Sequence, residues 1–146
     1  MEFRRGDTVE VSIKEEGFKG SYYTATLLSR VGKTQFLIEY KTLCTDHDET
    51  RLLREIVDAS NVRPFPPEIE VSEFSVLDKV DVYANDGWWV GRISAIADSS
   101  RYFVYFESTG DELAYPISKL RVHQELENGK WVVSHYRKVH FVTDVG

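Results

Sequence analysis

The chain carries one short pattern twice, first as Gly20-Ser21-Tyr22-Tyr23-Thr24-Ala25-Thr26-Leu27 and again as Asn85-Asp86-Gly87-Trp88-Trp89-Val90-Gly91-Arg92-Ile93. Both copies begin with a polar turn, which is followed by two adjacent aromatic residues and then by alternating apolar positions. Such alternation is typical of a strand with one buried face. A further strand that ends in an aromatic residue follows each copy, at 36–40 and at 102–106. The duplicated aromatic pair therefore predicts that one fold is built twice.

The flanking segments repeat in the same order. The Asp-x-Val-x-Val strand at Asp7 returns at Asp78, and 60–63 returns as 118–121. The first copy is longer only in two loops, where insertions are tolerated, so the repeat indicates two copies of one domain. The predicted domains are residues 1–67 and 72–138, joined by a short linker that contains Pro64, Pro66 and Pro67 and followed by a tail at 139–146.

Neither copy shows the periodicity of a long helix. The run 52–57 alone could be helical, but its counterpart at 112–117 contains Pro116, so we predict strands at both. Asn128-Gly129 between two strand-like runs predicts a hairpin. Small sheets avoid exposed edges by curling up, so the predicted fold is all-β, with two tandem small β-barrels packed together. Strands of the first copy are expected at 7–13, 21–30, 34–41, 53–59 and 62–63.

Composition limits the classes of function. The net charge of -6 argues against a duplex-DNA or general RNA binder and favours a basic partner. Cys44 is the only cysteine, so an internal disulfide is impossible and a reduced intracellular compartment is expected. The start of the chain lacks the apolar run of a secretory signal, and no run approaches the ~18 apolar residues of a membrane span. We therefore expect no membrane partner, and we also expect a monomer.

These motifs resemble a tandem Agenet module, the plant branch of the Tudor-like (Royal) family. The second copy departs from the pattern at Leu77, where the first has Gly6. The resemblance implies two Tudor-like barrels, binding rather than catalysis, a nuclear location, and recognition of the histone H3 tail, including its lysine-nine methyl mark. In the first copy the resemblance rests on Phe3-x-x-Gly6-Asp7-x-Val9-Glu10-Val11, 20–27, Ile38-x-Tyr40 and Val62-Arg63-Pro64. In the second copy it rests on Phe74, Asp78-x-Val80-x-Val82, 87–93, Phe106 and Leu120-Arg121.

Tudor-like barrels hold a methylated ammonium group in a cage of aromatic faces, by cation–π attraction of about 0.5–2 kcal/mol per contact. The resemblance places the first cage at Tyr22, Tyr23 and Tyr40, with a carboxylate from Asp46, Asp48 or Glu49. The equivalent second set is Trp88, Trp89 and Phe106, with Asp86, Glu107 or Asp111 nearby. The alternative is that these aromatic residues form the cores, or, for Trp88 and Trp89, the interface between the barrels.

The acidic residues admit two interpretations. The loop at 45–49 is either a solvated loop or, with Asp86 and Asp111-Glu112, a surface that attracts the lysines and arginines of a histone tail. It lacks the spacing of a calcium loop, so no metal is expected. His47, His123, His135 and His140 show no metal-ligand spacing, and we expect His123 and His135 to lie on the surface even if they meet across the hairpin.

No sequence motif supports catalysis. There is no nucleophile-elbow or phosphate-loop pattern, and acidic neighbours disfavour the thiolate of Cys44. We therefore expect neither an enzyme nor a cofactor. Two further functions stay open: RNA binding, for which Arg4-Arg5 and Arg137-Lys138 are the candidate basic residues, and recognition of an unmodified peptide or protein partner.

Overall fold

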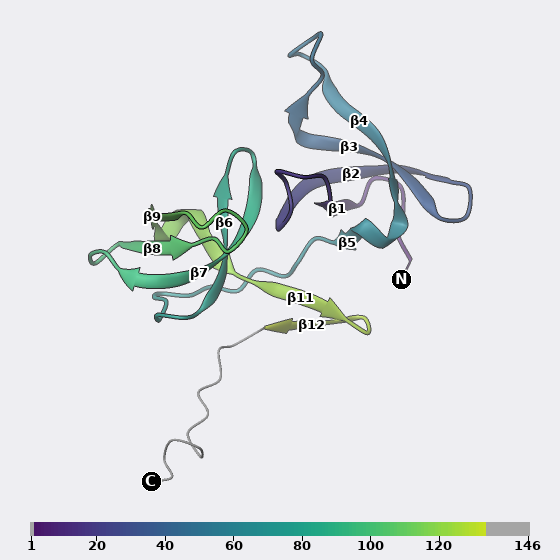
Figure 1. Ribbon diagram of the computed structural model, residues 1–146. Coiled ribbons are helices and arrows are strands. Elements are labelled where there is room, and N and C mark those ends of the chain that lie inside the picture. The colour runs from purple at the N-terminus through teal and green to yellow at the C-terminus, as the bar shows by residue number, and fades with distance from the viewer. Residues whose placement is uncertain (1, 134–146) are drawn as a thin grey trace.

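The computed structural model describes residues 2–133, which form two β-barrels and a C-terminal hairpin (Figure 1). The first barrel is built from five strands and a 3-10 turn: β1 (Thr8–Ile13), β2 (Ser21–Val31), β3 (Gln35–Cys44), β4 (Leu52–Asp58), η1 (Ala59–Asn61) and β5 (Val62–Pro64). The second repeats this order with β6 (Lys79–Ala84), β7 (Gly87–Ile96), β8 (Arg101–Tyr105), β9 (Glu112–Pro116), η2 (Ile117–Lys119) and β10 (Leu120–Val122). The predicted all-β fold is confirmed, and the strands lie where alternation placed them.

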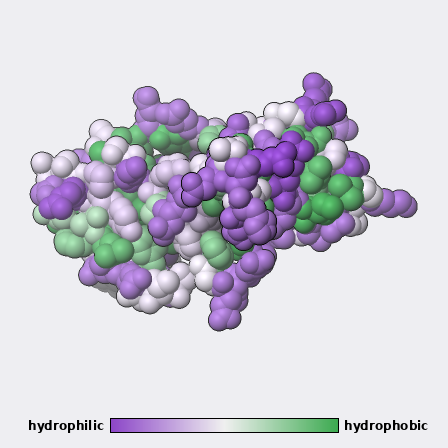
Figure 2. Space-filling model, turned by 90° about the horizontal axis from the view of Figure 1, so that it is seen from above, coloured by the Kyte–Doolittle hydropathy of each residue, from purple (hydrophilic) through white to green (hydrophobic). Residues whose placement is uncertain are grey.

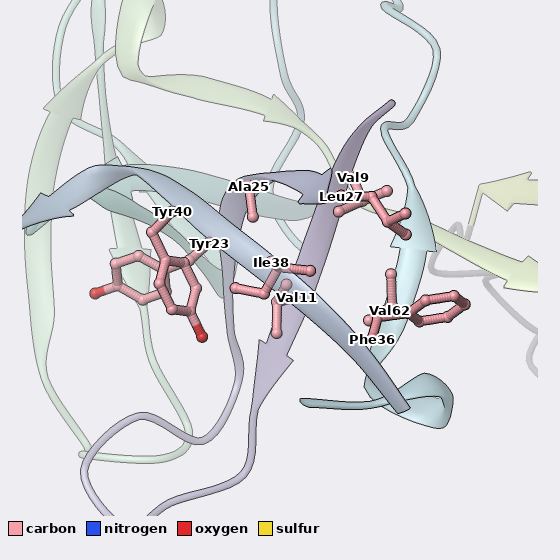
Figure 3. Close-up of a cluster of buried hydrophobic side chains, with 9 residues drawn as sticks. All are labelled: Val9, Val11, Tyr23, Ala25, Leu27, Phe36, Ile38, Tyr40 and Val62. Carbon is pink, nitrogen blue, oxygen red and sulfur yellow. The ribbon is translucent and has the colours of Figure 1, made fainter. Parts of the chain in front are cut away.

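Each barrel encloses its own core. In the first, β1 pairs with both β2 and β5, so the sheet closes around Val9, Val11, Ala25 and Ile38. Tyr23 and Tyr40 lie together at one end of this core, and Phe36 and Val62 lie at the other end (Figure 3). In the second barrel the core contains Phe74, Val80, Val82, Ile93, Tyr102, Val104, Phe106 and Leu120.

The chain reversals follow from backbone chemistry. Asn85 and Asp86 have φ of 51° and 66°, the left-handed conformation that a two-residue turn between β6 and β7 requires. Asn128 and Gly129 make the same kind of turn between β11 (Gln124–Glu127) and β12 (Lys130–Val133). The predicted hairpin is thereby confirmed as far as Val133, and its expected continuation to residue 136 lies outside the described residues.

Leu77 keeps the backbone conformation of the glycine it replaces. Its φ is 82°, against 92° for Gly6, and its N–H donates to the carbonyl of Ile93 as that of Gly6 donates to Leu27, both at 2.8 Å. A leucine in this conformation costs about 1–2 kcal/mol. The departure at Leu77 therefore leaves the fold intact and adds local strain.

The two barrels are joined by strand pairing as well as by the linker. Ser21 pairs with Trp89 and Tyr22 with Trp88, so β2 and β7 run antiparallel across the boundary. The N–H of Val90 also donates to the carbonyl of Gly20, at 2.9 Å. All ten barrel strands thus belong to one hydrogen-bonded sheet. Trp89 also packs against both cores, so the interface role considered for it is confirmed, whereas Trp88 takes part through the backbone pairing.

The described residues contain no helix long and apolar enough to cross a membrane. Hydrophilic residues cover the middle of the face seen in Figure 2, with apolar patches on both sides. Large apolar side chains are exposed on both barrels, among them Ile56 on β4 and Ile96 on β7.

Candidate functional site

The two aromatic residues of each pair point to opposite faces of their strand. Tyr23 on β2 belongs to the first core, and Trp89 on β7 packs against both cores. Their neighbours face a different environment: the Cζ atom of Arg63 lies 3.7 Å from the ring centroid of Tyr22, and that of Arg121 lies 4.2 Å from Trp88. Guanidinium groups therefore occupy ring faces of Tyr22 and Trp88, and the structure does not bring either residue into the cage predicted for it.

The first aromatic cluster is closed. Tyr23 and Tyr40 are 1% and 2% exposed, and their ring centroids lie 6.4 Å apart at an interplanar angle of 86°. Both hydroxyls are used: Tyr23 donates to the carbonyl of Asn85 at 2.9 Å, and Tyr40 donates to Glu55 Oε1 at 2.8 Å. Burial and the hydrogen bond to Glu55 raise the pKa of Tyr40 well above its usual range. These two tyrosines form the end of the core in this conformation.

A residue of the second barrel packs against this cluster. Trp89 lies edge-on to Tyr23 at 6.4 Å, and Phe18 from the loop between β1 and β2 stacks on Trp89 at 6.2 Å. A Cβ atom placed on Gly87 would lie 2.6 Å from Cζ of Tyr23, so only glycine admits the tyrosine ring there. The first-barrel cluster is therefore part of the barrel–barrel contact.

The second aromatic cluster surrounds an open cavity of about 250 Å³. Trp89, Phe106 and Tyr115 line it, and the rings of Phe106 and Tyr115 meet edge to face at 6.1 Å. The indole N–H of Trp89 donates to the carbonyl of Ala84 at 2.7 Å, which fixes the ring. Gly17 of the first barrel also lines the cavity, so both barrels contribute to this site.

Asp111 supplies a carboxylate to the same cavity. The turn before it is held by hydrogen bonds from the N–H of Gly110 to the carbonyl of Phe106 and from the N–H of Phe106 to the carbonyl of Asp111, at 2.7 and 2.9 Å. Burial raises the pKa of Tyr115, and the charge of Asp111 adds to this effect. The cavity thus combines three aromatic rings with one nearby negative charge.

The acidic loop at 45–49, which was predicted to serve the first cage, makes hydrogen bonds within its own turn. Asp46, Asp48 and Glu49 are all exposed, and Asp48 accepts hydrogen bonds from the N–H and hydroxyl of Thr50, which lower its pKa. No hydrogen bond or ion pair within residues 2–133 links Asp46 to Tyr23 or Tyr40. Asp48 therefore stabilises its own turn.

Other carboxylates lie closer to the aromatic clusters. A concavity of about 400 Å³ at the first barrel is lined by Tyr40 together with Glu15, Glu55 and Asp58. Asp86 lies near enough to Tyr23 to raise the pKa of its phenol, after the larger effect of burial. Glu112 accepts a hydrogen bond from the hydroxyl of Ser94.

The prediction that His123 lies on the surface is wrong. Its side chain is 1% exposed and lies between the carboxylates of Asp81 and Glu125. Sequence reasoning also omitted Tyr115 and Glu55. Tyr115 lies two residues after Leu113 on β9, both line the cavity, and Tyr115 pairs with Tyr102, so the period of two was a usable signal for it. His123 follows β10 in a stretch without a comparable pattern.

Solved structures resemble both barrels together. The crystal structure of Arabidopsis thaliana AGDP1 AGD34 aligns with a TM-score of 0.85 and 34% sequence identity, covering 90% of this chain and 90% of that chain. The crystal structure of ADCP1 tandem Agenet domain 3-4 aligns with a TM-score of 0.81 and 31% identity, covering 90% and 88%. The fold and the aromatic cavity define a tandem Tudor-like β-barrel module.

Sequence comparison identifies the family within this class of protein. The Agenet domain family model matches residues 6–67. Protein AGENET DOMAIN (AGD)-CONTAINING P1 of Arabidopsis thaliana is 44% identical over 133 residues, which are 90% of this chain and 26% of the relative. DUF724 domain-containing protein 3 of Arabidopsis thaliana is 32% identical over 138 residues, 90% of this chain and 20% of the relative. The chain belongs to the Agenet family, and it spans about a quarter or less of these curated relatives.

Proposed function

We propose that this chain is a chromatin reader that binds a methylated lysine of the histone H3 tail, with lysine nine as the favoured position, in the nucleus. The observation that carries the proposal is the open cavity of the second barrel, where Trp89, Phe106 and Tyr115 stand beside Asp111. Membership of the Agenet family and the net charge of -6 support a basic peptide as the ligand.

The chemistry of the cavity suits a methylated ammonium group. Such a cation has few N–H donors, so aromatic faces bind it better than carbonyl groups do. Asp111 adds Coulomb attraction and accepts the N–H that a mono- or dimethylated lysine retains. The aromatic rings are held by packing and by the Trp89 hydrogen bond, so little ordering is needed when a ligand enters.

The first barrel offers a complementary site for unmodified basic groups. Glu15, Glu55 and Asp58 surround the concavity beside Tyr40, and carboxylates form charge-assisted hydrogen bonds with lysine, arginine or a free amino terminus. The loop between β1 and β2 contributes to both cavities, through Glu15 to this one and through Gly17 to the aromatic one. One extended peptide that passes this loop can therefore occupy both.

The alternative location for the methylated side chain is the first barrel, with Tyr22, Tyr23, Tyr40 and Asp46. Calorimetry with H3 peptides, unmodified or methylated at lysine nine, separates the two locations. We expect Tyr115→Ala to weaken binding of the methylated peptide at least tenfold, whereas Tyr40→Leu, which removes an aromatic ring from the first barrel, leaves the methyl preference unchanged. Tyr105→Ala is the matched control, because Tyr105 is an exposed tyrosine on the adjacent strand β8. Equal affinity of wild type for methylated and unmodified peptides would show that no methyl-lysine cage exists.

The RNA alternative has weaker support. Arg4 and Arg5 are exposed before β1, and residues 137–138 lie outside the described part of the chain. A steep dependence of RNA affinity on salt concentration would favour this function.

A further inference from the structure

A buried row of charged side chains connects both barrels with the C-terminal hairpin. Glu10 on β1 accepts hydrogen bonds from Arg63 Nη2 and from Arg121 Nη1, both at 2.8 Å. Arg121 Nε donates in turn to Asp81 Oδ2 at 2.9 Å, and His123 lies between Asp81 and Glu125. Glu10, Asp81 and His123 are almost fully buried.

The carboxylates of this row outnumber the guanidinium groups only at its histidine end. Glu10 and Asp81 are paired with Arg63 and Arg121, and Glu125, whose side chain is 45% exposed, adds a further carboxylate beside His123. Carboxylates within hydrogen-bond distance favour the charged form of a histidine. Among the described residues, Tyr22 also lies beside the row, and because burial raises the pKa of its phenol it stays neutral. An imidazolium at His123 pairs with both Asp81 and Glu125.

The hydrogen-bond geometry of the His123 ring independently indicates the protonated state. His123 Nδ1 lies 2.7 Å from Asp81 Oδ1, and Nε2 is within hydrogen-bond distance of Glu125 Oε2. A neutral imidazole has a single N–H, so one nitrogen lone pair would face a carboxylate oxygen. Only the doubly protonated ring can donate to both. Burial lowers the pKa of His123, but the hydrogen bonds and charges of Asp81 and Glu125 outweigh it, and the pKa lies above its ordinary value.

We propose that the protonated ring of His123 locks the C-terminal hairpin against both barrels and makes this docking dependent on pH. The hairpin runs from the second barrel toward β5 of the first (Figure 1). Next to His123, the carbonyl of Gln124 accepts from Arg63 Nη1 at 2.9 Å, and the Gln124 side chain donates to the carbonyl of Pro67 at 2.8 Å. Loss of the proton leaves one nitrogen lone pair of the ring facing a carboxylate oxygen and loosens these contacts. This inference is independent of the proposed ligand.

The direction of the pH dependence of stability follows from proton linkage. The native state binds the proton more tightly than the unfolded chain, whose histidine pKa is about 6.5. The stabilisation is therefore complete below about pH 6.5 and is lost as the pH rises through the higher native pKa. Across that window the unfolding equilibrium constant increases by up to about tenfold per pH unit.

Two quantities test the proposal: the protonation state of the His123 ring and the pH dependence of the free energy of unfolding. Ring ¹⁵N NMR of the full chain, with His123→Gln to assign the signal, should show both nitrogens of His123 protonated at pH 7. Glu125→Gln is the decisive variant, because its amide can donate to a neutral ring. It should lower the pKa of His123 and flatten the pH dependence of urea unfolding above pH 6.5. Amide exchange protection at Leu126 should fall with pH more steeply in wild type than in Glu125→Gln.

Two results would overturn the proposal. One is a native His123 that titrates below pH 6.5. The other is a free energy of unfolding whose pH dependence is the same in wild type and in Glu125→Gln. The Glu125 side chain is half-exposed, so this variant is expected to fold.

Discussion

The guanidinium carbon of Arg121 lies 4.2 Å from the ring centroid of Trp88, and Arg63 and Tyr22 have the same relationship at 3.7 Å in the other barrel. In each barrel the aromatic residue comes from the second strand and the arginine from the closing strand. Glu10 receives hydrogen bonds from both arginines. The repeated elements of the two barrels thus meet around one buried carboxylate.

We expect Glu10→Gln to destabilise the chain by about 3–5 kcal/mol, because it leaves two guanidinium groups without their shared carboxylate. Urea unfolding monitored by far-ultraviolet circular dichroism measures the change. Glu39→Gln is the matched control, since Glu39 pairs with the largely exposed Arg54 and such surface pairs contribute about 0–1 kcal/mol. Equal effects of the two substitutions would contradict a central role for Glu10.

We expect Gly87→Ala to destabilise the chain by about 1–3 kcal/mol, because the added methyl group overlaps the ring of Tyr23. The same substitution in a Tyr23→Leu background tests the cause. If the tyrosine ring is the obstacle, the cost of Gly87→Ala falls in that background, and the double-mutant cycle shows a coupling energy. Additive effects would point instead to the backbone of residue 87.

We expect Asp111→Asn to change the methyl-state preference of the chain. The carboxylate of Asp111 accepts the N–H of a dimethylated lysine but finds no N–H on a trimethylated one. The substitution should weaken binding of the dimethylated peptide several-fold and bring it closer to that of the trimethylated peptide. Calorimetry with both peptides measures this, and Glu127→Gln on the hairpin is a charge-matched control. Equal losses for both peptides would indicate only a general electrostatic role.

We expect the contribution of Asp58 to stability to disappear in acid. Asp58 accepts hydrogen bonds from the N–H and hydroxyl of Ser60 at the start of η1, and these lower its pKa below the ordinary value. A lowered native pKa stabilises the fold above pH 3.8 and loses this effect as the pH falls through the native pKa. Asp58→Ala should therefore lower the thermal midpoint at pH 7, and the difference from wild type should shrink as the pH falls below 3.8 and through the native pKa. A difference that persists in acid would argue against this cap.

Local patterns were sufficient for the strands and turns, because period-two alternation and dipeptides such as Asn128-Gly129 act over a few residues. The same patterns marked Trp89 and Phe106 as aromatic positions of the repeated strands. They could not show that Tyr22 faces Arg63, or that His123 lies between Asp81 and Glu125, because these contacts depend on how distant strands pair. For the same reason the aromatic residues of the first barrel were expected to form an open cage, whereas Tyr23 is covered by Gly87 and Trp89 of the second.

The pairing of β2 with β7 means that neither repeat is complete by itself. If the two barrels were separated, Ser21 and Tyr22 would lose their hydrogen-bonded partners, and Trp89 would lose one of the two cores on which it packs. An exposed strand edge next to apolar aromatic surface invites association with other chains. The duplicated domains therefore share one sheet and one tryptophan between their cores, and we expect them to unfold together.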